Sequence, residues 1–310
     1  MKKFVLKLIL FSGLILGSLV LLNFLYVRTE AYRTMNDMEK FYNVPDNLEI
    51  VNVGSSHGLY GFDWSQEQVN GFNFSLVSQD FYYDLRLLEK FSSHLAEGAI
   101  VIIPISYFSF DTDRNDKEGD FQKMNGRYYS LLSPREIYDF ELQDYIRNCL
   151  LPVLSAGRKL INIISDHQPE NNLTKSINLY EFSQLPEKGR ERAQQHLELI
   201  NKTNHQENIN YLKELIEYSQ SKKFKPVLIT TPTTEWYFRN FSDEFLREFS
   251  SLVKAIAADY SIPYLDYSQD VSFRNKPELF LDTDHLNAIG RKIFTSRIID
   301  DLSFYLKPNE

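Results

Sequence analysis

Two short motifs, one near each end of the chain, carry residue types that could transfer an acyl group. In Gly54-Ser55-Ser56-His57-Gly58, two glycines flank two hydroxyls, so the backbone can turn sharply and expose a serine. In Leu281-Asp282-Thr283-Asp284-His285-Leu286-Asn287, an acid and a histidine stand three residues apart. A turn of this spacing lets the Asp282 carboxylate accept a hydrogen bond from one nitrogen of His285, while the other nitrogen faces a serine hydroxyl. Together the motifs predict a Ser-His-Asp site.

In such a site the histidine takes the proton of the attacking serine and later returns it to the leaving group. The aspartate fixes the imidazole tautomer and stabilises the imidazolium. Each motif alone is more often structural: the first as an ordinary turn, the second with Asp282 or Asp284 capping the final helix. Their occurrence together favours a catalytic pair. We expect His57 to shape the pocket rather than to act as the base, because adjacent side chains in a tight turn point apart.

Apolar runs of strand length alternate with segments of helical periodicity along most of the chain. The predicted strands are Leu48–Val53, Phe72–Val77, Ala99–Ile105, Pro226–Thr231 and Ile262–Asp266. The predicted helices are Tyr82–Leu95, Gln195–Ser221, Asp243–Tyr260 and Asn287–Tyr305. This alternation predicts an α/β three-layer sandwich with a mostly parallel, flavodoxin-like five-stranded sheet. Sites in such sheets lie just beyond the carboxyl ends of the strands, which is where the first motif falls.

The amino terminus predicts one transmembrane helix. Three lysines precede Leu8–Tyr26, a run of nineteen residues without a charge. As a helix it would span about 28 Å, close to the thickness of the hydrocarbon layer. The lysines favour a cytoplasmic amino terminus, which places the rest of the chain outside. A cleaved signal peptide is the competing interpretation, but Leu22–Tyr26 lacks the small-x-small pattern that a signal peptidase needs.

These features predict three parts of the chain. Residues 1–27 would be the membrane anchor, 28–47 a polar stalk, and 48–310 the α/β domain, with a helical or irregular insertion at about 111–195. Within the insertion, Pro134–Ile164 should be helical in pieces, and Asp166–Arg192 should be irregular.

Composition excludes several function classes. The chain has 310 residues, with 42 acidic against 34 basic side chains and a formal charge of −8, which disfavours nucleic acid as a partner.

The single cysteine, Cys149, cannot form an intramolecular disulfide, and no Cys/His pair has zinc-ligand spacing. Asp111-Thr112-Asp113-Arg114-Asn115 begins like a calcium loop, but Asp116 stands where glycine is needed, so we expect a solvated loop. We therefore expect neither a metal nor a cofactor.

The two motifs resemble the blocks that open and close the SGNH (GDSL-type) hydrolase superfamily. Gly54-Ser55-Ser56 after an apolar strand is similar to the Gly-Asp-Ser block, and Asp282-x-x-His285 to the final Asp-x-x-His block. The resemblance implies that Ser56 is the nucleophile, with Asp282 and His285 completing the triad. Ser55 takes the position usually held by Asp and is the fallback nucleophile.

The middle blocks depart from the family pattern, although the resemblance extends over roughly residues 48–305. The family usually donates oxyanion hydrogen bonds from a glycine after the second strand and an asparagine after the third. Ser78 and Ser106 occupy those positions here. The resemblance thus makes Ser56, Ser78 and Ser106 the oxyanion candidates. A missing donor would cost about 3 to 4 kcal/mol of transition-state stabilisation.

Sequence blocks that depart from the SGNH pattern in this way, in a chain with an N-terminal membrane anchor, resemble one branch of the superfamily. These extracytoplasmic proteins act beside membrane-bound O-acyltransferases, as do the D-alanyl transfer protein of lipoteichoic acid synthesis and the alginate acetylation proteins. The resemblance implies an O-acyltransferase or esterase that forms an acyl-serine. Its substrate would be an acylated polysaccharide or teichoic-acid-like polymer at the cell surface or in the periplasm, and a membrane-bound O-acyltransferase would be a candidate partner.

The alternative is a non-catalytic SGNH-like scaffold or polysaccharide-binding subunit of a polymer-modification complex. The altered oxyanion positions favour that alternative. Four aromatic residues near predicted strand ends, Trp64, Tyr107, Trp236 and Tyr237, are candidates for a sugar-stacking platform, although most aromatic side chains are expected in the core.

Overall fold

The computed structural model describes residues 1–29, 32, 35–114, 124–156, 183–200 and 205–306. The chain divides into two compact units. One is built from Met1–Asn43 and Met124–Glu170, and the other from Val44–Lys123 and Asn171–Glu310. The second unit contains both sequence motifs.

The second unit is built on a five-stranded sheet in which every strand pair is parallel. Its strands are β1 (Leu48–Asn52), β2 (Gly71–Asn73), β3 (Leu95–Pro104), β4 (Lys225–Thr230) and β5 (Tyr264–Asp266), in the order β2-β1-β3-β4-β5. The predicted α/β class and five-stranded parallel sheet are confirmed. Ile100–Ile103 of β3 are fully buried, as expected for strands covered on both faces.

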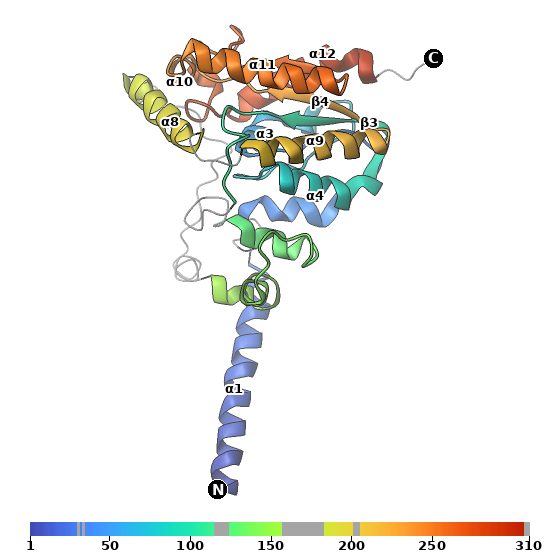
Figure 1. The fold of residues 1–310 in the computed structure, drawn as a ribbon. Helices are drawn as coiled ribbons and strands as arrows, with labels where there is room; N and C mark the ends of the chain where they lie inside the picture. Colours follow the sequence, from blue (N-terminus) through green and yellow to red (C-terminus); the bar gives the residue numbers. More distant parts are fainter. Residues whose placement is uncertain (30–31, 33–34, 115–123, 157–182, 201–204, 307–310) are drawn as a thin grey trace. The chain divides into compact units, whose positions relative to one another are not determined.

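Helices cover the sheet on both faces. The α-helices of the described part of this unit are α3 (Ser56–Gly61), α4 (Phe81–Phe91), α8 (Leu185–Ile200), α9 (His205–Ser221), α10 (Glu235–Phe238), α11 (Asp243–Asp259) and α12 (Ala288–Leu306). Figure 1 shows α12 on one side of β4, with α4 and α9 on the other. Phe294, Ile298 and Leu302 of α12 join the strands in one large core cluster. Asp80 caps α4 by accepting a hydrogen bond from the Tyr83 N–H.

One sequence prediction about this unit was wrong. The last part of the segment predicted to be irregular, Leu185–Arg192, is helical, whereas residues 166–182 lie outside the described part of the chain. Helix α8 buries Leu185, Gly189, Ala193 and His196, a helical spacing that the many charges obscured. The predicted helix 195–221 falls into α8 and α9, with residues 201–204 outside the described structure.

The predicted solvated loop after residue 110 was also wrong for its described part. Arg114 is fully buried, forms an ion pair with Asp80 and donates a 2.7 Å hydrogen bond to Asn208 Oδ1. Its guanidinium also lies 4.5 Å from the centre of the Tyr211 ring. A buried arginine requires such partners, and they come from distant positions that the local charge pattern does not reveal.

The first unit contains the predicted apolar helix. Helix α1 (Lys2–Tyr26) is the one helix in the described residues that is long and apolar enough to cross a membrane, and a signal sequence has the same properties. The other elements of the unit are η1 (Met35–Asn43), η4 (Gly126–Ser130), α6 (Leu142–Tyr145), η5 (Ile146–Leu150) and η6 (Pro152–Ser155). The last three are helical pieces within the predicted range 134–164, of which residues 157–164 are not described.

Candidate active site

A sharp turn after β1 positions the first motif. Gly54 has φ 114°, and a Cβ there would lie 3.1 Å from Cδ of Pro104, so glycine fits both the conformation and the close approach. Its N–H donates a 2.7 Å hydrogen bond to Asp84 Oδ1. Helix α3 starts two residues later at Ser56. The turn therefore presents Ser56 and His57 at the carboxyl end of β1.

A second turn, just before α12, positions the other motif. Asp282 Oδ1 accepts hydrogen bonds from the backbone N–H groups of Asp284, at 3.0 Å, and His285, at 2.8 Å. The Leu281 N–H donates to the His285 carbonyl at 2.8 Å, which closes the turn. These bonds make the Asp282 carboxylate part of the turn itself.

The two turns meet in a continuous chain of hydrogen bonds. Ser56 Oγ lies 2.8 Å from His285 Nε2, although the two residues are 229 positions apart. His285 Nδ1 lies 2.8 Å from Asp282 Oδ2. Since the ionised carboxylate can only accept, Nδ1 carries the hydrogen, and Nε2 accepts from the Ser56 hydroxyl. The structure thus brings together the three residues predicted as a triad, in the geometry that a nucleophilic serine requires.

The electrostatic surroundings make His285 a stronger base. Burial favours its neutral form, but the charges of Asp282 and Asp284 outweigh burial and raise the pKa of His285 above its ordinary value. The second carboxylate is close, with Asp284 Oδ1 3.7 Å from His285 Nδ1. A histidine with two neighbouring carboxylates accepts the serine proton at a lower free-energy cost than one without them.

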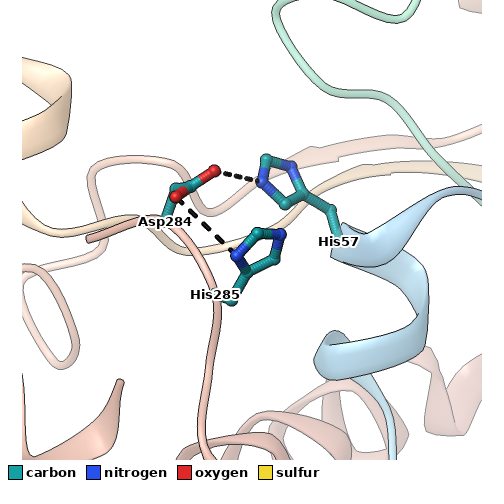
Figure 2. Close-up of side chains that lie close together, drawn as sticks. All are labelled: His57, Asp284 and His285. Carbon is teal, nitrogen blue, oxygen red and sulfur yellow. Dashed lines mark hydrogen bonds and ion pairs between the residues drawn. The ribbon is translucent and has the colours of Figure 1, made fainter. Parts of the chain in front are cut away.

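A second hydrogen-bonded chain lies directly beside the first. His57 Nδ1 is 2.6 Å from Ser106 Oγ, and His57 Nε2 is 3.0 Å from Asp284 Oδ2. The His57 and His285 rings meet edge to face, with centroids 4.9 Å apart. Figure 2 shows the Asp284 carboxylate linked to both imidazoles. Arg192 of α8 completes the network, because its Nε lies 3.1 Å from each oxygen of Asp284.

The charges of this network define its protonation. Burial would raise the pKa of Asp284, but His285, His57 and Arg192 hold it well below its usual range. Burial lowers the pKa of His57. An ionised Asp284 accepts from His57 Nε2–H, so Nδ1 accepts from the Ser106 hydroxyl. We find His57, Asp284 and Ser106 joined through Arg192 to α8, an arrangement that the sequence analysis missed.

The structure places the oxyanion candidates differently. The Ser106 hydroxyl faces His57, and its N–H donates to Ser109 Oγ at 2.8 Å. Ser106 would have to give up one of these bonds to serve an oxyanion. Ser78 has φ 54°, a conformation that glycine adopts most easily. This is the position where the SGNH pattern described above has a glycine. Ser56 is the first residue of α3, where a backbone N–H has no partner within its own helix.

Aromatic side chains close the site around His57. The Phe108 ring lies 5.4 Å from that of His57 and 4.2 Å from that of His196. His196 Nδ1 is 2.6 Å from the Tyr237 hydroxyl, and burial lowers the pKa of His196 to about 3, so this imidazole is neutral. Tyr107 and Tyr237 are buried, so these two platform candidates belong to the core.

His57, Asp284 and His285 are also the residue types that bind metal ions. They are all buried, and one ligand atom from each lies within 4.8 Å of the others. These atoms already have partners, however: Arg192 and His57 at Asp284, and Asp282 at His285 Nδ1. A metal ion would have to displace the Arg192 cation, so we interpret the cluster as an ion-pair network.

A cavity of about 310 Å³ lies beside the second turn. Charged and polar side chains of α8 line it on one side, including Lys188, Arg192 and Gln195, and Asp282, Thr283 and Asp284 line it on the other. The cavity therefore adjoins Asp282, the last residue of the hydrogen-bonded series Ser56, His285 and Asp282.

Comparisons with known proteins give matches only among solved structures. No protein-family model matches the chain, and no curated protein does. A candidate acylhydrolase from Bacteroides fragilis is 11% identical, with a TM-score of 0.42, over 90% of this chain and 100% of its own. A lipase/acylhydrolase from Enterococcus faecalis is 12% identical, with a TM-score of 0.37, over 85% and 99%. A catalytic mutant of an acetylxylan esterase from Geobacillus stearothermophilus is 11% identical, with a TM-score of 0.38, over 86% and 99%. At TM-scores this low we draw no argument from these likenesses.

Proposed function

We propose that the chain is an SGNH-like serine acyl-transfer enzyme, an esterase or an O-acyltransferase. One observation carries the proposal: the Ser56 hydroxyl, the His285 imidazole and the Asp282 carboxylate form one hydrogen-bonded chain, with both links 2.8 Å long. Links of this length permit proton transfer from the serine without rearrangement. The placement of the first motif just after β1 and of the second just before α12 supports the same assignment.

In the proposed reaction Ser56 Oγ attacks the carbonyl carbon of an acyl ester as His285 Nε2 takes its proton. The tetrahedral intermediate collapses when the imidazolium returns that proton to the leaving alcohol, which departs and leaves the acyl group on Ser56. Water or a sugar hydroxyl then enters, loses its proton to His285 and attacks the acyl carbon. When the second tetrahedral intermediate collapses, His285 returns that proton to Ser56 Oγ, which restores both residues and releases the acylated acceptor. Asp282 holds the ring in position throughout and stabilises its charged form.

We further propose that the substrate is an acylated polysaccharide or teichoic-acid-like polymer outside the cytoplasm. Helix α1 supports a membrane anchor, and the lysines before it favour a cytoplasmic amino terminus. The cavity beside the second turn, with its mixed charges, suits a polar polymer better than an apolar ester. A membrane-bound O-acyltransferase is the proposed partner that would supply or receive the acyl group.

A fluorophosphonate probe tests the proposed nucleophile on the full chain in detergent. We expect labelling of the parent protein, and its loss in both Ser56→Ala and His285→Ala. Ser55→Ala is the matched control, since the Ser55 side chain makes no capping bond in α3, and it should keep the label. Labelling that persists in Ser56→Ala contradicts the assignment. A folded parent that hydrolyses no ester and resists the probe, yet binds polysaccharide, supports the non-catalytic scaffold instead.

A further inference from the structure

An exposed apolar stripe runs along the first unit. Leu142, Ile146, Leu150 and Leu154 follow one another at a spacing of four through α6, η5 and η6, with exposed fractions of 66%, 36%, 55% and 49%. Leu142, Ile146 and Leu150 lie toward one side of the continuous helical stretch of α6 and η5. Leu154 follows in η6, after the backbone leaves the helical conformation at Leu151. Four large aliphatic side chains exposed within one short segment are unfavourable in water.

The opposite side of the same segment packs against protein. The Asn148 side chain donates to the Asp144 carbonyl at 2.9 Å and sits against η4, where a Cβ added to Gly126 would lie 2.9 Å from it. Asn148 thus faces the protein, whereas the four aliphatic side chains face outward together with the polar side chains of Gln143 and Arg147.

One side chain of the apolar helix fixes the position of this segment. Asn23 Nδ2 donates to the Leu150 carbonyl at 3.3 Å, and its Oδ1 accepts from the Val153 N–H at 3.1 Å. Tyr26 and Val153 belong to one buried cluster, against which Leu19 packs. In hydrocarbon an asparagine needs such partners for both ends of its amide. The stripe is thus tied to the last turns of α1.

We propose that this stripe, Leu142 to Leu154, lies in the bilayer that α1 crosses, at the outer boundary between hydrocarbon and headgroups. The proposal rests on the proposed membrane anchor. Lipid is the occupant because the stripe is bonded to the end of α1, where Leu22 and Leu25 are each 54% exposed and need hydrocarbon around them. The Tyr26 and Tyr32 rings meet at a tilt of 60°, with centroids 5.2 Å apart, next to this end of α1, and tyrosines at this level suit an interfacial aromatic belt.

The segment contains its own probe position. Cys149 is the single cysteine of the chain and is partly exposed, next to Leu150. The full chain is labelled at Cys149 with a polarity-sensitive fluorophore and placed in phosphatidylcholine/phosphatidylglycerol vesicles. Quenching by lipids with a nitroxide near the headgroup is compared with quenching by aqueous iodide. We expect a blue-shifted emission, and iodide quenching at least about threefold weaker than for the same label on the unfolded chain.

Two variants make the test specific. Leu150→Asn with Leu154→Asn should raise iodide quenching at least about twofold and weaken lipid quenching, whereas Leu199→Asn, at an aliphatic side chain of the other unit that is 40% exposed, should change neither. Resistance to carbonate extraction reports α1 separately. If the chain resists carbonate extraction but iodide reaches the label, the proposal for the stripe is wrong while the membrane anchor stands. If carbonate extracts the chain, the membrane anchor and the stripe are both wrong. Protection in native membranes but not in pure lipid vesicles also overturns the proposal, because a protein would then cover the stripe.

Discussion

Arg192 Nε lies 3.1 Å from both carboxylate oxygens of Asp284, and this contact joins helix α8 to the turn that carries His285. The Asp284 side chain is fully buried, whereas one third of the Arg192 side chain is exposed. Asp284 also holds His57. The Asp284–Arg192 ion pair therefore acts on both imidazoles, on His57 through a hydrogen bond and on His285 in addition to Asp282.

Removal of the arginine charge should disturb this network. In Arg192→Met, Asp284 loses a counter-charge but keeps His57, so we expect a loss of about 2 kcal/mol in unfolding free energy, below the full cost of breaking a buried pair because Arg192 is partly exposed. The loss is measured by urea denaturation, and fluorophosphonate labelling should slow in parallel. Arg190→Met, which breaks an exposed pair with Glu187 on the same helix, is the control and should cost less than about 0.5 kcal/mol. Equal losses in the two variants would contradict a special role of Arg192.

The pH profile of esterase activity should report the raised pKa of His285. The base works only when neutral, so activity in the parent should rise with pH through a midpoint above the ordinary value of 6.5. Asp282→Asn removes the largest contribution that raises this pKa, so the midpoint should move to lower pH while the plateau falls by about 10²- to 10⁴-fold. An unchanged midpoint would show that Asp282 does not act on His285.

Gly58 in α3 should tolerate no side chain. A Cβ there would lie 2.3 Å from Ser75 Oγ and 2.6 Å from the Val53 carbonyl, and the backbone oxygen cannot move away cheaply. We expect Gly58→Ala to lower unfolding free energy by about 1 to 3 kcal/mol and to displace Ser56, with a loss of probe labelling. Gly61→Ala in the same helix meets only a Thr231 methyl at 3.3 Å. If the two variants were equally stable and active, the close packing of α3 on β1 would be refuted.

Asp84 should make stability fall as the pH rises. Burial raises its pKa to about 8, so the unfolded chain loses this proton near pH 4 while the folded chain keeps it. Between these values the unfolded state binds fewer protons, and folding becomes less favourable with increasing pH. Asp84→Asn keeps the acceptor for the Gly54 N–H and should be the more stable form, by on the order of 2 kcal/mol at pH 8 and by little at pH 4. Thermal melts of both proteins between pH 4 and pH 8 measure this difference in stability. A difference that does not change with pH would contradict the raised pKa of Asp84.

The sheet and the Ser56-His285-Asp282 chain could be predicted because their signals are local. Buried parallel strands are continuous runs of aliphatic residues, as at Ile100–Ile103, and such runs can be recognised without knowing their neighbours. Asp282 and His285 stand within one turn, and the placement of sites beyond strand ends pointed to the motif that contains Ser55 and Ser56. The resemblance to the SGNH blocks then selected Ser56. Only the contact between Ser56 and His285 had to be inferred across a long stretch of sequence.

The second chain of hydrogen bonds could not be predicted, because every link in it is long-range. His57 pairs with Ser106 over 49 positions and with Asp284 over 227, and Arg192 reaches Asp284 over 92. No periodicity connects such residues, and the segment that carries Arg192 was predicted to be irregular. The only local hints were the polar neighbours: His57 directly follows Ser56, and Asp284 directly precedes His285.

The separation of 229 positions between Ser56 and His285 also has a consequence for biosynthesis. At about 5 to 20 residues per second, the ribosome takes roughly 11 to 46 s to go from one to the other. Helix α1 leaves the ribosome first, and the nucleophile follows without its base. During this interval the Ser56 hydroxyl has no His285 to accept its proton, and the hydrogen-bonded site can assemble only after translation has passed the turn before α12.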